Sequence, residues 1–380
     1  MMKTGIRILD DKIGEIPGNV AVLLSTSPGI DPAPFGINIM DAALKNNLKC
    51  VYVVNNKPAS AVRREAETMG LDISRYEKNN SLRIVDAFSG YMGIHSDEKY
   101  VVENPFNTKN ILDEIEKIEK GDILFVDSVS SYIDMKESPK ELLQMINKLK
   151  EKMTVVALFS AWEYEQKIMK EIKDSFDAVL TVKPVEEVTI VRQFLFPEKI
   201  GWKKIEKFAV PVKVLKPGGV KVYFPKILVT GPYNAGKSSM VKALSTSAVS
   251  VDRMGTTVAL DHGYMDYKGF AADLYGTPGQ EDFDPILQYL ADEAVAVILV
   301  VDSTKPETFI RAKEMLSKTK AYGLPIVVAA NKQDMSNALN VDAIKKKLAL
   351  PGDVSVCPTV AIEKKGVEKL LDELTEKLMG

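Results

Sequence analysis

The feature that most constrains the fold of this chain is the alternation of short apolar runs with amphipathic stretches. Residues 35–45, 60–69 and 110–119 have the spacing of amphipathic helices. Strands that alternate with helices predict βαβ units and a mostly parallel sheet. The runs that read as strands in the first half are residues 19–25, 50–54, 82–85, 123–127 and 154–159.

A second series of the same kind follows a change of pattern. After residue 176 the sequence turns to strand-like ribbons, which end at the turn signal Lys216-Pro217-Gly218-Gly219. The new series opens at Phe224, and a length of 380 residues is enough for two domains. We therefore predict an α/β protein with two three-layer domains of the phosphate-loop type, residues 1–223 and 224–380.

A glycine-rich loop follows the strand expected at residues 226–230. The loop, residues 231–238, fits the pattern G-x-x-x-x-G-K-[ST], in which a strand-to-helix turn binds phosphates. Lys237 would contact the β and γ phosphates and the Ser238 hydroxyl would bind Mg²⁺. The main-chain N–H groups expected to surround the phosphates belong to Asn234, Ala235, Gly236, Lys237, Ser238 and Ser239.

The preference for a base is predicted by Asn331-Lys332-Gln333-Asp334, which comes directly after the apolar run at residues 325–330. Ligands bind at such strand ends in parallel sheets. The Asp334 carboxylate can accept two hydrogen bonds from the ring N–H and the exocyclic amine of guanine, whereas adenine offers no such pair of donors. Together with Asn331 and Lys332, it predicts a site for GTP or GDP.

Composition excludes several other classes of protein. The 50 basic and 52 acidic residues give a net charge of −2, which offers a nucleic acid no electrostatic attraction. No apolar run approaches the roughly 18 residues that span a bilayer. Two histidines and two separated cysteines, Cys50 and Cys357, make a zinc site or disulfide framework improbable, so a reducing, cytoplasmic compartment is expected.

With these motifs, residues 224–380 resemble the small Ras-like GTPases, most of all the Arf branch and the bacterial gliding-polarity GTPases. The guanine motif continues as Met335 and, two residues on, Asn337-Ala338, as in Arf proteins. Gly276-Thr277-Pro278-Gly279-Gln280 is similar to the second switch. Ala361, five residues before Gly366, matches the last guanine-contacting loop.

The resemblance implies roles for further residues. Thr257 would close on Mg²⁺ and the γ-phosphate as the first-switch threonine, with Thr256 as its competitor. The Gly279 N–H would bind the γ-phosphate, and Gln280 would orient the attacking water. Arg253 has the spacing of an arginine that acts on the γ-phosphate from the first-switch loop, and a solvated loop cation is the alternative.

The chain also departs from the family's pattern. The aspartate on the Mg²⁺ side of the second switch falls on Gly276, and Asp273 could take its place only with an insertion before Gly279. By strand alternation the side chain of Asp273 would point to the opposite face. The other arginine of this half, Arg311, is expected on a helix face that points away from the site.

The first half, over roughly residues 4–223, resembles RecA-like domains of the KaiC and archaeal RadA type. Asp127 keeps the aspartate at the end of a strand, but the first loop lacks a lysine and carries Pro32 and Pro34. Each proline removes an N–H donor. Asn56 and Lys57 stand where the family has catalytic glutamates. These departures predict a degenerate ATPase.

The sequence thus predicts a GTP-binding molecular switch that hydrolyses GTP slowly and carries an N-terminal RecA-like regulatory or interaction module. Protein partners would be an exchange factor or an activating protein, and the RecA-like domain could form oligomers. The alternative is an oligomerising scaffold whose guanine nucleotide stays bound without turnover.

Overall fold

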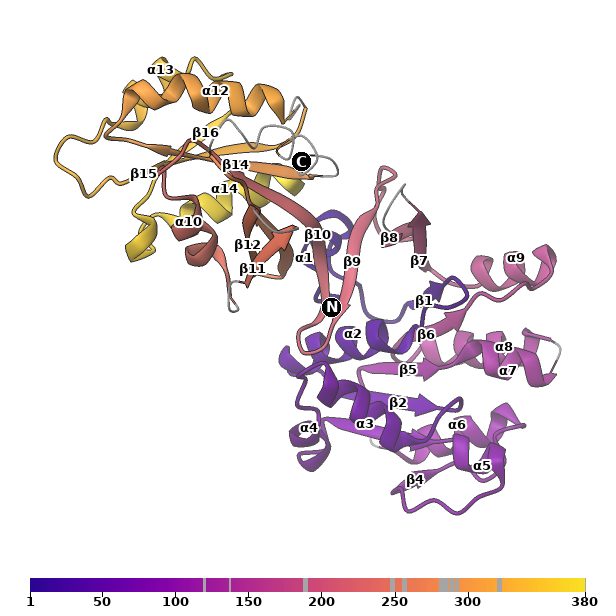
Figure 1. Ribbon diagram of the computed structural model, residues 1–380. Helices are drawn as coiled ribbons and strands as arrows, with labels where there is room; N and C mark the ends of the chain where they lie inside the picture. The colour runs from indigo at the N-terminus through magenta and orange to yellow at the C-terminus, as the bar shows by residue number, and fades with distance from the viewer. Residues whose placement is uncertain are drawn as a thin grey trace. The chain divides into compact units, whose positions relative to one another are not determined.

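The computed structural model of this protein describes residues 1–118, 121–136, 138–186, 191–246, 250–254, 258–279, 287, 291, 294–319 and 323–379. It consists of two compact α/β units, Met1–Val222 and Tyr223–Gly380 (Figure 1). Both units combine parallel strands with helices, as the alternating pattern predicts. The boundary between them falls inside strand β10, Gly219–Thr230.

The strands of the first unit are β1 (Ala21–Thr26), β2 (Cys50–Val54), β3 (Leu82–Asp86), β4 (Tyr100–Val101), β5 (Ile123–Asp127), β6 (Thr154–Ser160), β7 (Ala178–Glu186), β8 (Val191–Ile200), β9 (Val210–Leu215) and the start of β10. Its helices are α1 (Arg7–Ile13), α2 (Ala33–Lys45), α3 (Ala59–Thr68), α4 (Ser74–Lys78), α5 (Phe88–Met92), α6 (Thr108–Lys117), α7 (Val129–Lys136), α8 (Lys140–Lys150) and α9 (Gln166–Asp174).

The first sheet has the strand order β10-β9-β8-β7-β1-β6-β5-β2-β3-β4. From β7 to β4 neighbouring strands are parallel, and the pairs β7–β8, β8–β9 and β9–β10 are antiparallel. The turn at residues 216–218 joins β9 to β10. It is therefore a hairpin turn within the first unit, and the unit boundary comes later in the chain.

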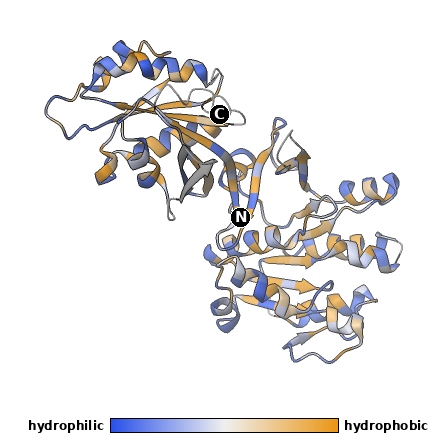
Figure 2. Cartoon of the chain, viewed as in Figure 1, coloured by the Kyte–Doolittle hydropathy of each residue, from blue (hydrophilic) through white to orange (hydrophobic). Residues whose placement is uncertain are grey.

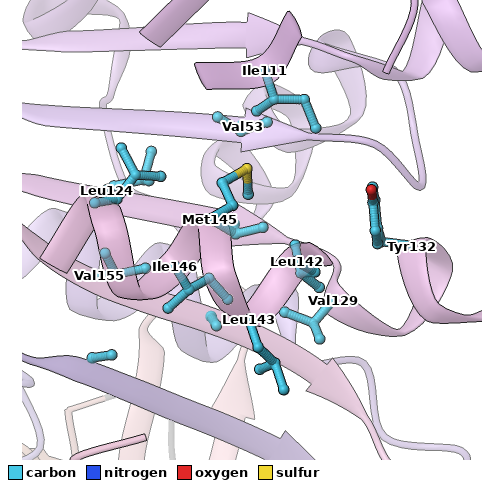
Figure 3. Packing of buried hydrophobic residues seen from close by; sticks show 14 of the residues in the cluster. Val53, Ile111, Leu124, Val129, Tyr132, Leu142, Leu143, Met145, Ile146 and Val155 are labelled. Atoms are coloured by element: carbon cyan, nitrogen blue, oxygen red, sulfur yellow. The ribbon is translucent and has the colours of Figure 1, made fainter. Parts of the chain in front are cut away.

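One face of the parallel strands packs against helices α6, α7, α8 and α9. Alternate strand residues such as Val53, Leu124 and Val155 belong to one buried cluster with Leu142, Met145 and Ile146 of α8 (Figure 3). This alternation arises because successive side chains of a strand point to opposite faces. Helix α2 packs on the other side, against β2, β5, β6 and α3.

The second unit contains the remainder of β10, α10 (Lys237–Leu244), β11 (Ser250–Met254), β12 (Val258–Tyr267), β13 (Phe270–Gly276), β14 (Ala296–Asp302), η2 (Pro306–Thr308), α12 (Phe309–Lys318), β15 (Ile326–Asn331), α13 (Val341–Leu348), β16 (Ser355–Pro358), η3 (Ala361–Glu363) and α14 (Val367–Met379). Its strands are ordered β11-β12-β13-β10-β14-β15-β16. The pairs β10–β14, β14–β15 and β15–β16 are parallel.

Helices cover both faces of this second sheet. Helices α12 and α13 enclose a core that includes Leu299, Val328 and Ile344. Helices α10 and α14 lie against strands of the sheet, α10 on β12 and β13 and α14 on β15 and β16. The apolar colour follows the central strands in Figure 2, and the helices carry blue on one side. Within the described ranges, no helix is long and apolar enough to cross a membrane.

The packing of α8 leads to a stability prediction. Ile146 is 1% exposed, so Ile146→Ala leaves a cavity and should destabilise the first unit by about 2–5 kcal/mol. Lys148→Ala on the same helix is the control, because that side chain is 58% exposed. Calorimetric melting curves of both variants and the wild type measure the difference. Equal melting temperatures for all three proteins would contradict this account of the core.

Candidate functional site

The glycine-rich loop lies between the end of β10 and the start of α10. Gly231 has a φ of 146°, and a Cβ there would lie 2.1 Å from the carbonyl oxygen of Val300. Gly236 has a φ of 98°, and its Cβ would lie 2.3 Å from Nδ2 of Asn331. Backbone angle and space therefore both require glycine at these two positions, which are the two glycines of the motif.

The buried side chain of Asn331 joins this loop to a second one. Its Nδ2 donates a hydrogen bond to the Ala235 carbonyl oxygen at 3.0 Å, and its Oδ1 accepts one from the Ala361 N–H at 2.9 Å. Asn331 ends β15 and is 4% exposed. Because both ends of the amide are used, the positions of the glycine-rich loop and the residue-361 loop depend on each other.

A pocket of about 470 Å³ opens beside these loops, a volume typical of a small-molecule site. It brings together residues that lie up to about a hundred positions apart in the sequence. Asn331, Asp334 and Ala361 do not line it, although Asn331 borders it through Gly236. Its lining residues are Tyr233, Asn234, Gly236, Lys237, Ser238, Ser239, Asp261, Gly276, Thr277, Pro278, Gly279 and Lys332.

The Lys237 ammonium lies within the curve of the loop, where its Nζ donates to the Pro232 carbonyl oxygen at 2.8 Å. Burial lowers the pKa of Lys237, the negative charge of Asp261 opposes this effect, and the positive charge of Arg311 adds a smaller lowering, which together leave the pKa at about 8. An ammonium that has lost part of its water is stabilised by an anion. The geometry therefore suits the binding of a phosphate group.

The first turn of helix α10, which follows the glycine-rich loop, provides further N–H donors. An α-helix leaves the N–H groups of its first turn without partners inside the helix, and here these belong to Lys237, Ser238 and Ser239. The Ala235 N–H donates to the Pro232 carbonyl oxygen at 3.2 Å, so that predicted donor is used within the loop. The remaining donors suit an anion, which the helix dipole also favours.

Lys332 and Gln333 are held by the end of β14. Nζ of Lys332 lies 2.6 Å from Oδ2 of Asp302. Burial raises the pKa of Asp302, but hydrogen bonds from Lys332 and Thr304 outweigh that effect and leave it lowered. Nε2 of Gln333 donates to Ser303 Oγ at 2.8 Å. Sequence reasoning missed Asp302, because its partnership depends on the neighbouring strand ends of β14 and β15.

Asp334 is exposed to solvent at the edge of this arrangement. The pKa of Lys365, on the loop that follows Ala361, is raised mainly by its hydrogen bond with Glu363 and to a smaller extent by the negative charge of Asp334. The predicted guanine-contacting residues Asp334 and Ala361 therefore belong to neighbouring loops, and Ala361 is hydrogen-bonded to Asn331, three residues before Asp334. A base bound between these loops would have the Asp334 carboxylate within reach of solvent on one side.

The second-switch sequence folds back onto the glycine-rich loop. The Thr277 N–H donates to the Val229 carbonyl oxygen at 3.0 Å, which continues the strand direction of β13 beside β10. A Cβ at Gly279 would lie 2.5 Å from the Tyr233 nitrogen and 2.6 Å from Nζ of Lys237. Glycine is therefore required at residue 279 for this close approach.

Two of the predicted catalytic residues, Thr257 and Gln280, cannot be placed in this site because they lie outside the described residues. Thr256, the alternative to Thr257, lies outside them as well. Arg253 is described at the backbone only, where it pairs with Ala259 in the β11–β12 ladder. The expectation that Arg253 lies in a loop was wrong, because antiparallel pairing with β12 makes residues 250–254 a strand.

Arg311 also differs from its expected position. Its side chain is only 14% exposed and contacts Glu314 at 3.4 Å, and its charge acts on Lys237. The Arg311 charge therefore acts on the pocket, although Arg311 is not one of its lining residues. Asp273, in contrast, accepts a hydrogen bond from the Tyr223 hydroxyl and lies 3.8 Å from His262, which agrees with the orientation expected from strand alternation.

The oxygen-bearing side chains that line the pocket include the Ser238 hydroxyl, which the sequence predicts as a ligand of Mg²⁺, and the Asp261 carboxylate, which sequence reasoning did not identify. Mg²⁺ is usually held by one or two protein oxygens together with substrate phosphates and water. No cluster of three His, Cys, Asp or Glu residues that could hold a metal by itself occurs in the described part of the chain.

The corresponding loop of the first unit is occupied by its own groups. The Ala33 N–H donates to Oδ1 of Asp31 at 2.9 Å, and Pro34 has no N–H. The N–H groups of Phe35 and Gly36 both donate to the Pro32 carbonyl oxygen at 3.1 Å. Every donor in the first turn of α2 is therefore satisfied without a phosphate.

A lysine neutralises the strand-end aspartate of the first unit. Nζ of Lys57 lies 3.5 Å from Oδ2 of Asp127 and 3.8 Å from Asp31. Asp127 is fully buried and also accepts hydrogen bonds from the Tyr52 hydroxyl at 2.8 Å and the Asn56 amide at 3.1 Å. Burial raises the pKa of Asp127, while Lys57 and Tyr52 lower it.

Known proteins are similar to parts of this chain. The translation initiation factor IF-2 of Dehalococcoides mccartyi is 32% identical over 186 residues, 46% of this chain and 30% of that protein. The chain thus spans less than a third of the initiation factor. A KaiC-like protein of Pyrococcus horikoshii has a TM-score of 0.47 and 22% identity, with coverage of 58% of this chain and 97% of that structure.

Two family models match successive parts of the sequence. The KaiC ATPase family matches residues 2–227, and the ADP-ribosylation factor family matches residues 219–378. The ADP-ribosylation factor-like protein 3 of Chlamydomonas reinhardtii is 33% identical over 133 residues, which are 33% of this chain and 72% of that protein. The chain therefore belongs to the KaiC family in its first unit and to the Arf family of GTPases in its second.

Proposed function

We propose that this protein is a guanine-nucleotide-dependent molecular switch with slow GTP hydrolysis. The observation that carries the proposal is the Asn331 amide, which joins the glycine-rich loop at Ala235 to the guanine loop at Ala361. Phosphate recognition and base recognition are thereby parts of one site. The Arf-family GTPase domain supports guanine nucleotide as the ligand.

In this proposal each part of the nucleotide has its own residues. Lys237 binds the β and γ phosphates, together with the N–H groups of Asn234, Gly236, Ser238, Ser239 and Gly279. Guanine lies between the Asp334 carboxylate, Lys332 and the residue-361 loop, and Asn331, which accepts from the Ala361 N–H, fixes the position of that loop. Mg²⁺ would be held by Ser238 and Thr257, where it neutralises charge that develops on the phosphates.

Hydrolysis is assigned to residues around the γ-phosphate. Gln280 orients the attacking water, and Arg253 is the arginine proposed to stabilise the transition-state charge. Opening and closing of the second-switch segment at Gly279 would report which nucleotide is bound. An exchange factor and an activating protein are the expected partners, and a cytoplasmic location is proposed.

The first unit, residues 1–223, is proposed to act as a regulatory or interaction module without ATPase activity, and residues 224–380 as the GTPase. Two observations support this division of labour. Asp31 and Pro32 take up the N–H donors of α2, and Lys57 supplies a cation to Asp127 where a metal would otherwise be needed. Oligomers through this unit remain part of the proposal.

The Lys57–Asp127 pair gives a stability prediction. Lys57→Met leaves a buried carboxylate without its cation and should cost about 3 kcal/mol at pH 7, or roughly 6–12 °C in the melting temperature of the first unit. Burial raises the pKa of Asp127 and Lys57 lowers it, so loss of Lys57 raises the folded-state pKa further and the folded variant takes up a proton at a higher pH than the wild type. The deficit of the variant should therefore shrink as pH falls from 7 towards 5.

The double variant Lys57→Met/Asp127→Asn removes both charges and should recover most of that loss. Lys167→Met, at an exposed lysine of the same unit, is the control and should leave the melting temperature unchanged. An unaffected melting temperature in Lys57→Met would mean that the ammonium does not neutralise Asp127.

Nucleotide binding tests the proposal directly. Calorimetry should detect GTP and GDP binding to the full chain, and Lys237→Ala should weaken both by on the order of 100-fold or more because the phosphate charge loses its partner. The same variant should bind no ATP, since the first unit offers no phosphate site. Lys242→Ala, exposed on helix α10, is the matched control. Steady-state turnover of GTP then separates a switch from a scaffold that never hydrolyses.

Base selection provides a separate test. Asp334→Asn should weaken GTP binding about 10- to 100-fold, because a charged acceptor for two guanine donors is lost. The same change should favour xanthosine triphosphate, whose extra carbonyl accepts a hydrogen bond from the new amide. Competition binding measures the preference, with Asp353→Asn as an exposed control. An unchanged preference would remove Asp334 from the base site.

A further inference from the structure

At Gly276 the pocket has no side chain that could bind Mg²⁺. This glycine ends β13, lines the pocket beside Thr277, and has no side chain to offer a metal. The site therefore lacks a carboxylate at the position where the resemblance to small GTPases places one. A dication held by phosphates and the hydroxyls of Ser238 and Thr257 would have no carboxylate from the protein to balance its charge.

The neighbouring strand supplies a carboxylate at this place. Asp261 of β12 is the direct antiparallel partner of Gly276. A Cβ built on Gly276 would lie 3.0 Å from the Cβ of Asp261 and 3.3 Å from its Oδ2. Both positions therefore face the same side of the sheet, and the Asp261 carboxylate lies over the space that a side chain at residue 276 would fill.

The surroundings of Asp261 are those of a ligand-facing group. It lines the same pocket as Ser238 and Lys237, and its charge acts on the Lys237 ammonium. The structure pairs its carboxylate with no hydrogen-bond donor among the residues that it describes. The side chain is also half-buried, so its charge is less screened than that of a surface aspartate.

We propose that Asp261 is the carboxylate of the Mg²⁺ site, supplied across the β12–β13 pair in place of the one absent at Gly276. The inference rests on the guanine-nucleotide site proposed above. Carboxylate oxygens are preferred ligands or water-binding partners of Mg²⁺, and loss of such a partner typically lowers metal affinity 10- to 100-fold. This role also accounts for glycine at residue 276, because a Cβ there would crowd the Asp261 side chain.

The test measures how Mg²⁺ slows the release of GDP that carries a fluorescent methylanthraniloyl group. Free Mg²⁺ is varied with an EDTA buffer, and the concentration that gives half of the full slowing reports metal affinity without any turnover. Asp261→Asn should raise this concentration 10- to 100-fold. In excess EDTA its release rate should stay within a few-fold of the wild-type rate, because the nucleotide contacts are intact.

Two further variants make the result specific. Asp266→Asn removes one carboxylate from the same strand, five residues along and thus on its other face, and should leave the Mg²⁺ dependence unchanged. Asp261→Gly/Gly276→Asp moves the carboxylate to the opposite strand and exchanges which position carries a side chain. This exchange should restore the Mg²⁺ dependence to within a few-fold of wild type, whereas Asp261→Gly alone should not.

The outcomes distinguish this inference from the proposed function. A wild type whose GDP release responds to Mg²⁺ and an Asp261→Asn variant with the same response would overturn the role of Asp261 and leave the nucleotide site intact. Faster release by Asp261→Asn in EDTA would assign Asp261 to the nucleotide or to strand packing, and would also overturn the inference. A wild type that binds no guanine nucleotide would remove the proposed function, and the inference with it.

Discussion

The second unit depends on one buried amide. Asn331 must donate to Ala235 and accept from Ala361 at the same time, and no other side chain of that size offers a donor and an acceptor at its two ends. A buried amide without either partner would cost roughly 1–3 kcal/mol for each group left unsatisfied. The glycine-rich loop, the end of β15 and the residue-361 loop are therefore specified together, which is why distant sequence motifs form one pocket.

The turn that joins a strand to the following helix differs between the two units in what satisfies its N–H donors and charges. In the second, glycine at residues 231 and 236 lets the chain curve around the Lys237 ammonium, and the first turn of α10 faces the pocket. In the first, Asp31 accepts from α2 and Lys57 neutralises Asp127. One corner suits an external anion and metal, whereas the other is satisfied by the chain's own charges.

Local sequence predicted the fold class and the membership of both families, because alternating periodicity and the G-x-x-x-x-G-K-S loop are determined by neighbouring residues. It could not reveal Asp261 or Asp302, since both act through pairing with another strand whose register the sequence does not specify. It also misplaced Arg253 and Arg311, because helical or loop character alone does not fix which surface a long side chain meets. The roles of Thr257 and Gln280 and the domain boundary stay predictions.

The Asp31 carboxylate at the start of α2 has a thermodynamic consequence. A ligand stabilises a fold by an amount that grows with the logarithm of its concentration, provided that only the folded state binds it. The first unit, whose helix terminus is filled by its own aspartate, would gain nothing from the nucleotide pool. The second would become more stable as that pool rises, so one polypeptide would combine a unit of constant stability with a unit whose stability follows the supply of nucleotide.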